Sequence, residues 1–166
     1  MAPYLLKRGR NMLYDVDVLK LSPAFYVAYP VLQYPEIMGK QSRPYACLLV
    51  EVHDYFICIP YRTHIDHPNA YHFRRSRRSQ RSKSGLDYSK MAIIQNSNYI
   101  ESTPAVIDQD EYNETMIHLN TIVTEAVSYL DGYIDHIQGT KTLHPKEFLR
   151  KYGFSTLPYF HDVLGL

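Results

Sequence analysis

The feature that most constrains the fold of this chain is a regular run of apolar residues in its second half. Between residues 108 and 139 these residues recur at steps of three and four, the spacing of one face of an α-helix. They are Tyr112, Met116, Leu119, Val123, Ala126, Leu130, Ile134 and Ile137. Asp108 and Glu111 have the pattern of a capping box, and Gly139 is a typical end signal. The spacing predicts one long amphipathic helix whose apolar face packs in the core.

The remaining segments have the composition of a small sheet with short helices. Four segments have the alternation or the β-forming residues of strands: 14–21, 45–52, 55–59 and 91–95. His53-Asp54 predicts a hairpin between the middle two, and Pro60 is expected to end its second strand. Short helices are predicted at 23–29, 157–164 and 145–152, the last with Gly153 as a C′ glycine. Residues 31–44 and 61–84 are predicted loops, the second with a helical turn.

Length and composition fit one domain spanning residues 1–166. A chain of 166 residues buries about two-thirds of its unfolded surface on folding. The predicted fold is α+β, a compact and largely antiparallel sheet packed by one long and several short helices. Cys47 and Cys58 lie in apolar runs without CxxC spacing, so they are expected to be reduced core residues. No run of 18 apolar residues occurs, and the expected location is cytoplasmic, without a membrane partner.

The net charge of +1 conceals an uneven distribution of charges. Residues 62–90 contain eight lysines and arginines but only two acids, whereas residues 91–140 contain eight acids and no lysine or arginine. The first segment is therefore suited to meet an anion and the second to avoid one.

Residues 61–84 carry most of this positive charge, interleaved with serines and aromatic rings. Arginine donates paired hydrogen bonds to phosphate, and aromatic rings stack on unpaired bases. The residues expected to bind nucleic acid are Tyr71, His72, Phe73, Arg74, Arg75, Arg77, Arg78, Arg81, Lys83 and Ser84. Composition does not separate RNA from DNA, and the alternative is a solvated or disordered charged loop.

Two kinds of chemistry are open to the residues that follow the second hairpin strand. His64, Asp66, His67 and His72 form a histidine-rich group, but their spacing does not place two imidazoles on one helix face as metal sites require, so no metal is expected. Metal-free RNA cleavage needs a group that activates the 2′-hydroxyl, a cation and a hydrogen-bond donor. Arg62-Thr63-His64 supplies a cation, a hydroxyl and an imidazole. A structural role for His64 is the alternative.

Several stretches of the chain resemble the type III toxins, the ToxN/AbiQ, CptN and TenpN group of endoribonucleases, most closely the TenpN and CptN branches. The stretches are Leu21-Ser22-Pro23 with Phe25-Tyr26; Pro35-Glu36-Ile37 to Lys40 with Arg43-Pro44-Tyr45; Ile59 to Ile65 with His67; Lys83 to Lys90; and Phe154-Ser155-Thr156-Leu157 to Phe160-His161. Their order and spacing, more than any single motif, carry the resemblance.

The resemblance implies a fold distantly similar to the MazF/Kid toxins. It also implies a cofactor-independent endoribonuclease that acts without metal on cellular or phage RNA and leaves a 2′,3′-cyclic phosphate. The expected partner is an RNA antitoxin, a pseudoknot that the toxin itself excises from a repeat transcript, bound in a cyclic protein–RNA assembly. The implied biological role is phage defence or plasmid maintenance.

The resemblance also implies site residues. In the ToxN branch a Thr-Ser-x-Lys sequence after the second hairpin strand carries catalytic groups, and here that place reads Arg62-Thr63-His64-Ile65. Thr63 takes the serine-like position and the lysine is missing, so Arg62 or His64 substitutes for it. A family lysine falls near Lys40 or Arg43, and a family tyrosine falls at Phe25 or Tyr26, of which only Tyr26 has a hydroxyl. The expected catalytic residues are Arg62, Thr63, His64, Lys40, Arg43 and Tyr26.

A non-catalytic RNA- or DNA-binding module is the second hypothesis. The two hypotheses differ in where His64 lies. A catalytic His64 packs with Thr63 near Arg62 and Arg43 around an anion-sized space, and a structural His64 turns into the core.

Overall fold

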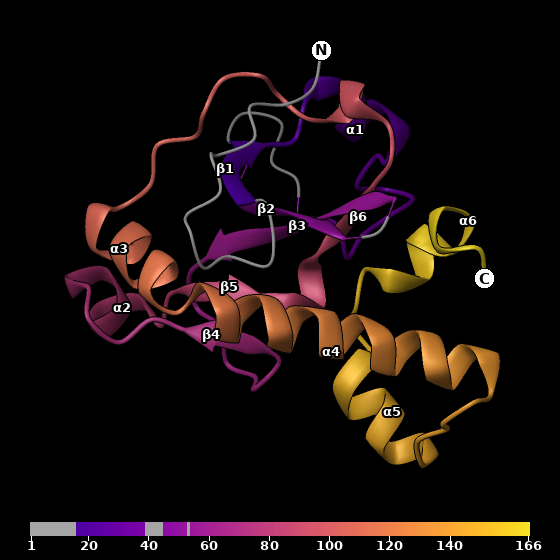
Figure 1. The fold of residues 1–166 in the computed structure, drawn as a ribbon. Coiled ribbons are helices and arrows are strands. Elements are labelled where there is room, and N and C mark those ends of the chain that lie inside the picture. Colours follow the sequence, from indigo (N-terminus) through magenta and orange to yellow (C-terminus); the bar gives the residue numbers. More distant parts are fainter. Residues whose placement is uncertain (1–15, 39–44, 53) are drawn as a thin grey trace.

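A computed structural model describes residues 16–38, 45–52 and 54–166 and has the predicted α+β architecture (Figure 1). In this part of the chain one antiparallel sheet comprises β1 (Val16–Lys20), β2 (Ala46–Val52), β3 (Tyr55–Arg62), β4 (Ala70–His72), β5 (Gly85–Asp87) and β6 (Ala92–Ile94). The α-helices are α1 (Pro23–Ala28), α2 (Arg77–Ser82), α3 (Gln109–Ile117), α4 (Leu119–Gln138), α5 (Pro145–Tyr152) and α6 (His161–Leu164). The described residues also form three short 3₁₀ turns, η1 (Tyr88–Lys90), η2 (Ser97–Tyr99) and η3 (Leu157–Phe160). No described helix is long and apolar enough to cross a membrane.

Strand β3 is the centre of the sheet and changes partner along its length. One edge pairs with β2, which confirms the predicted hairpin. The other edge pairs first with β6, through 56–58, and then with β5, through Tyr61 and Arg62. The prediction that Pro60 ends the strand is wrong. Proline lacks an N–H and cannot donate a hydrogen bond to a neighbouring strand. Pro60 lies between the residues that pair with β6 and those that pair with β5, so neither β5 nor β6 requires a donor at this position.

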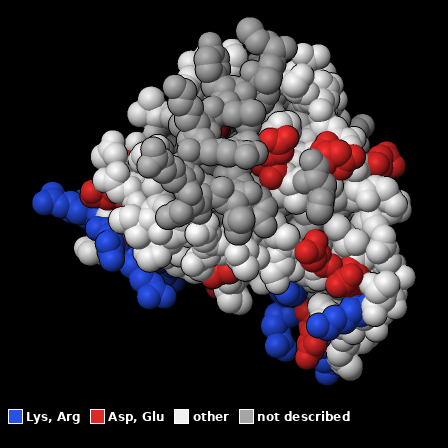
Figure 2. Space-filling model, viewed as in Figure 1, with Lys and Arg blue, Asp and Glu red and all other residues white. Residues whose placement is uncertain are grey.

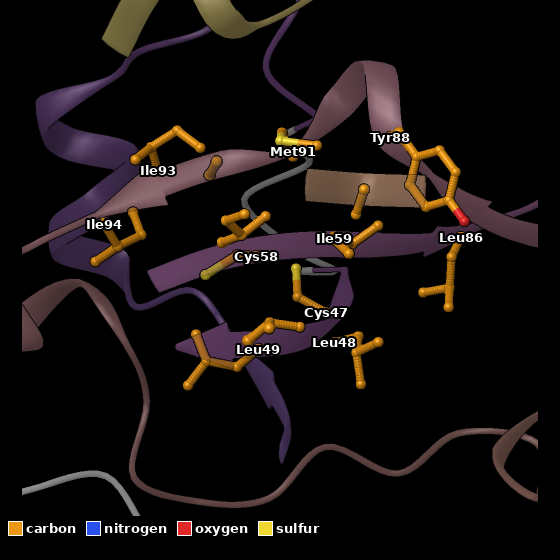
Figure 3. Packing of buried hydrophobic residues seen from close by; sticks show 14 of the residues in the cluster. Cys47, Leu48, Leu49, Cys58, Ile59, Leu86, Tyr88, Met91, Ile93 and Ile94 are labelled. Carbon is orange, nitrogen blue, oxygen red and sulfur yellow. The ribbon is translucent and has the colours of Figure 1, made fainter. Parts of the chain in front are cut away.

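Side chains on the two faces of β3 contact different parts of the molecule, because successive side chains of a strand point to opposite faces. Ile57, Ile59 and Tyr61 share the face toward α3, where the Tyr61 hydroxyl lies 3.0 Å from Oγ1 of Thr115. Cys58, Pro60 and Arg62 share the other face. Cys47 and Cys58 are both buried and free, in agreement with the prediction of core residues (Figure 3).

The prediction of one long helix from Asp108 to near Gly139 is wrong, because the chain breaks at His118 into α3 and α4. His118 has φ −104° and ψ 20°, outside the helical region. The apolar stripe drives the packing of α4, which buries seven residues including Leu119, Ile122 and Leu130. In contrast, α3 buries Glu111, Glu114 and Thr115. The two helices meet different surroundings, one apolar and one polar, and therefore follow different axes.

Residues 61–84 are more regular than the predicted loop. The expected helical turn is present as α2, but the end of β3 and the whole of β4 were missed, as was β5 just after this segment. Strands of three residues are too short to give a periodic pattern. Gly153 follows the end of α5, as predicted, but without the left-handed conformation that such a glycine often has. Its φ is −60°, and a glycine suits the position because a Cβ would lie 2.4 Å from the carbonyl oxygen of Leu149.

Gly85 is required by the close approach of two segments to β5. A Cβ at this position would lie 2.2 Å from the carbonyl oxygen of Tyr71 and 3.2 Å from Cδ1 of Ile65. We expect Gly85→Ala to lower the free energy of unfolding by about 2 kcal/mol, because the backbone of β4 has to shift. Urea denaturation measures the change. Gly139→Asn is the control, since Gly139 has open space around it and a left-handed φ of 77° that asparagine tolerates. Equal stabilities for wild type and Gly85→Ala would contradict this packing.

Candidate active site

The register of three strands gathers polar side chains on one face of the sheet. Arg62 on β3 pairs with Gly85 on β5, and Gly85 pairs in turn with His72 on β4. Residues directly opposite one another share a face, and Asp87, two residues beyond Gly85, shares it too. Arg62, His72 and Asp87 therefore lie on the same face, which is also the face of Cys58 and Pro60.

The buried carboxylate of Asp87 is the centre of this group. Its Oδ2 accepts hydrogen bonds from Nη1 of Arg62 at 2.7 Å and Nε2 of His67 at 3.2 Å. Its Oδ1 accepts from the backbone N–H and the hydroxyl of Ser89, at 3.0 and 2.6 Å. Burial raises the pKa of Asp87, but the hydrogen bonds from His67, Ser89 and Arg62 outweigh burial and lower it below its usual 3.8. Asp87 is thus a fixed anion that orients its neighbours.

His67 has the geometry of an orienting group, not of a proton carrier. Its Nδ1 accepts the backbone N–H of Asn69 at 3.2 Å, so its Nε2 carries the hydrogen that Asp87 accepts. Both ring nitrogens are therefore occupied. Nε2 of His72 donates to the carbonyl oxygen of His67 at 2.9 Å. Together with Ile65, which packs on Gly85, these contacts hold residues 63–69 over the sheet.

The predicted run Arg62-Thr63-His64 lies at the edge of this group. The Arg62 side chain is 25% exposed, Thr63 is half-buried and His64 is exposed. The backbone N–H of His64 donates to the carbonyl oxygen of Ser82, at the end of α2, with a distance of 2.6 Å. His64 has φ 57°, a conformation that costs free energy for a residue other than glycine. His64 is therefore not turned into the core, and its imidazole meets solvent beside α2.

The other predicted catalytic residues are not part of this group. Lys40 and Arg43 lie outside the described residues. Tyr26 is buried and lines a cavity of about 20 Å³ together with Pro60 and Lys90. Burial raises the pKa of the Tyr26 hydroxyl, so it stays protonated. The cavity is on the face of β3 that bears Arg62, because Pro60 and Arg62 are two residues apart.

The predicted nucleic-acid-binding residues divide into an exposed and a buried set. We call residues 74–83 the cationic segment. Its six cations are all exposed, and Figure 2 shows lysine and arginine side chains gathered over the α2 end of the molecule: Arg74, Arg75, Arg77, Arg78, Arg81 and Lys83. Tyr71 and His72 are half-buried. Phe73 is buried with its ring stacked on Tyr61, and the buried Ser84 donates to Glu111, so neither is available to a ligand.

Three residues of the site were not identified as such from the sequence. Asp87 and Ser89 lie in the stretch from Lys83 to Lys90, and His67 follows the stretch from Ile59 to Ile65. No site role was predicted for Asp87 or Ser89, and for His67 only metal binding was weighed. The available signal was an aspartate between two residues that favour strands, Leu86 and Tyr88, two positions before a serine. Among the described residues no group of three histidines, cysteines or acids could hold a metal ion, and the His67 and His72 rings are engaged by Asp87 and the backbone.

Comparison of the chain with protein-family models, with curated proteins and with solved structures finds no match. The function of this chain is therefore inferred from the geometry above and from its sequence motifs.

Asp87→Asn tests the central role of this carboxylate. We expect the free energy of unfolding at neutral pH to fall by about 3 kcal/mol, because Arg62 and His67 lose a charged acceptor. The pKa of Asp87 is lowered in the folded state, so its contribution is present above the unfolded value of 3.8 and is lost as the pH falls through the lower folded value. Urea denaturation across this pH range should show the two proteins converging in acid. Exposed Asp110→Asn is the control, and a pH-independent difference for Asp87→Asn would contradict the assignment.

Proposed function

We propose that this chain is the endoribonuclease toxin of a type III toxin–antitoxin system. It cleaves cellular or phage RNA without a metal ion and leaves a 2′,3′-cyclic phosphate. A pseudoknot RNA, excised from a repeat transcript by the toxin, inhibits it in a cyclic protein–RNA assembly. The proposal places the protein in the cytoplasm, in phage defence or plasmid maintenance.

The observation that carries the proposal is that the separate stretches resembling type III toxins come together in space. The small cavity is lined by one or more residues from each of the first four: Tyr26, Tyr45, Pro60 and Lys90. The Lys90 ammonium group forms an ion pair with Glu36 and donates to the carbonyl oxygen of Phe154 at 2.7 Å, which brings in the last stretch. Motifs far apart in a sequence that assemble on one face of a sheet are expected of a functional site.

The chemistry follows from the groups at the edge of this face. Asp87 fixes one Nη of Arg62, and the rest of the guanidinium is directed to the phosphate that is cleaved, where it stabilises the added charge of the phosphorane. The exposed His64 imidazole accepts the proton of the 2′-hydroxyl as its oxygen attacks phosphorus, and the Thr63 hydroxyl donates to a phosphate oxygen. The bond to the 5′-oxygen breaks, that oxygen takes a proton from water, and the hydroxide that remains takes back the proton held by His64.

A non-catalytic RNA- or DNA-binding module is the second candidate. The exposed cations over α2 favour it, because a cationic surface binds nucleic acid without any catalytic group beside it. The two functions differ in the effect of the edge residues. Replacing Arg62 or His64 should greatly reduce the activity of an endoribonuclease, but it should change the affinity of a binding module only a little.

We expect the wild-type protein, expressed without its antitoxin, to stop bacterial growth, and Arg62→Ala or His64→Ala to relieve this. Loss of one positioned catalytic group should lower the cleavage rate roughly a hundred-fold or more. Growth assays at matched expression and cleavage of labelled RNA measure the effect. Arg150→Ala, which removes an exposed arginine of α5, is the control.

Analysis of the products completes this experiment. Cleavage should persist in EDTA and leave cyclic phosphate ends. Variants as toxic as the wild type would show that the catalytic residues are wrongly assigned. Activity abolished by chelation and restored by Mg²⁺ or Zn²⁺ would contradict the metal-free mechanism.

The cationic segment should determine the salt dependence of RNA binding. Each phosphate neutralised on a single strand contributes about −0.7 to the slope of log affinity against log salt. Replacing Arg74, Arg75, Arg77 and Arg78 with alanine should therefore flatten the slope and weaken binding to the antitoxin RNA. A salt titration measures both. The control replaces Lys141, Lys146 and Arg150, the exposed cations at and near α5, and should change the slope less. An unchanged slope in the fourfold variant would mean that RNA binds elsewhere.

A further inference from the structure

The cationic segment raises a physical problem, since six positive side chains lie within ten residues and repel one another. A free chain of this composition would stay extended or disordered. Here it forms a defined turn and the helix α2, although no acidic residue occurs between positions 74 and 83. The acidic groups that offset this charge come from elsewhere in the chain: Asp66 pairs with Lys83 at 2.6 Å, and two glutamates come from α3.

Glu114 of α3 holds the start of the segment. Its side chain is only 2% exposed. Oε1 accepts the backbone N–H groups of Arg74 and Arg75 at 3.0 and 2.9 Å, and Oε2 lies 3.2 Å from the N–H of Arg74. One carboxylate thus binds two consecutive amides, where the chain leaves β4 and turns toward α2, and both arginine side chains remain in solvent.

Glu111, one turn earlier on α3, connects the two ends of the segment. It is 1% exposed, and its Oε1 accepts the hydroxyl of Ser84 at 2.5 Å and that of Ser76 at 3.4 Å. Ser76 is the N-cap of α2, where its Oγ accepts the N–H of Ser79 at 2.8 Å. Nε of Arg78 lies 3.9 Å from the same Glu111 oxygen. Residues on both sides of α2 are therefore tied to a single buried atom.

We infer that Glu111 and Glu114 are positioning residues that hold the cationic segment in the shape that binds RNA. The inference rests on the proposed RNA-binding function of that segment. Both glutamates belong to the acidic half of the chain, which the sequence indicated was suited to avoid an anion. Their buried carboxylates instead accept hydrogen bonds from backbone N–H groups and serine hydroxyls that lie beneath the proposed RNA-binding surface.

Neutralising these two carboxylates distinguishes an effect of charge from an effect of positioning, because the two predict opposite changes in RNA affinity. By charge alone, Glu114→Gln or Glu111→Gln makes the protein more positive and should tighten RNA binding. If the carboxylates hold the segment, the same variants should weaken binding, because the neutral glutamine oxygen is a weaker acceptor than a carboxylate. At position 114 the glutamine NH₂ group would also face the N–H of Arg74 in place of Oε2. Asp110→Asn is the matched control, since Asp110 is exposed on the same helix and the change in charge is identical.

The binding experiment uses a 2′-O-methyl oligoribonucleotide, which lacks the attacking hydroxyl and is not cleaved. We expect Glu114→Gln and Glu111→Gln to raise the dissociation constant about tenfold, the effect of losing one or two phosphate contacts, with a shallower salt slope. Asp110→Asn should bind as well as the wild type or slightly better. Glutamine variants that bind as tightly as Asp110→Asn would overturn the inference.

Limited digestion with trypsin provides a readout that does not depend on RNA. Trypsin cleaves after lysine and arginine, so loosening of the segment should accelerate cleavage between residues 74 and 83 in the glutamine variants but not in Asp110→Asn. If the wild type binds no oligonucleotide, the proposed function fails, while the digestion still tests the positioning role. If Glu111→Gln does not fold, Ser84→Ala removes its shortest hydrogen bond and takes its place. Cleavage at the wild-type rate in all variants would overturn the inference.

Discussion

Four hydrogen bonds converge on the buried carboxylate of Asp87, and the positions of the groups around it follow from them. A carboxylate removed from water is costly unless its oxygens are fully bonded. Arg62 and His67 supply donors from two different segments, and Ser89 supplies two more from the turn after β5. The requirement to satisfy one buried anion therefore fixes the end of β3, the crossing of residues 63–69 and the start of η1.

The same principle acts a second time on the other side of the sheet. Glu111 and Glu114 are buried next to Thr115, which bonds to Tyr61 on the strand that carries Arg62. Tyr71, whose hydroxyl pKa is raised to about 12 by burial and by Glu114, belongs to the same polar cluster. The candidate active site and the cationic segment are thus built on opposite faces of β3, β4 and β5, each around buried acids.

Much of the fold could be predicted from the sequence, because it depends on periodicity. The β2–β3 hairpin, β6, α5 and the apolar face of α4 all follow from regular patterns that local composition reveals. The break at His118 could not be predicted in this way, since the apolar spacing continues across it and the partners of Glu111 and Glu114 are distant in the sequence. Of the candidate site, Arg62 and His64 were identified from residue type, whereas Asp87 and His67 become neighbours only through the register of β5.

The contacts beneath α2 also separate what can vary in this protein from what cannot. All six cations are exposed, and in the described residues an acid lies within ion-pair distance only of Arg78 and Lys83, so single exchanges among the other four can adapt the surface to a different nucleic acid. Ser76, Ser84 and Glu111 meet at one oxygen atom, and a change in any of them removes a hydrogen bond from at least one of the others. Diversification is therefore open to the arginines one at a time, while the serines and the glutamate have to change together, although up to 35 residues separate them in the sequence.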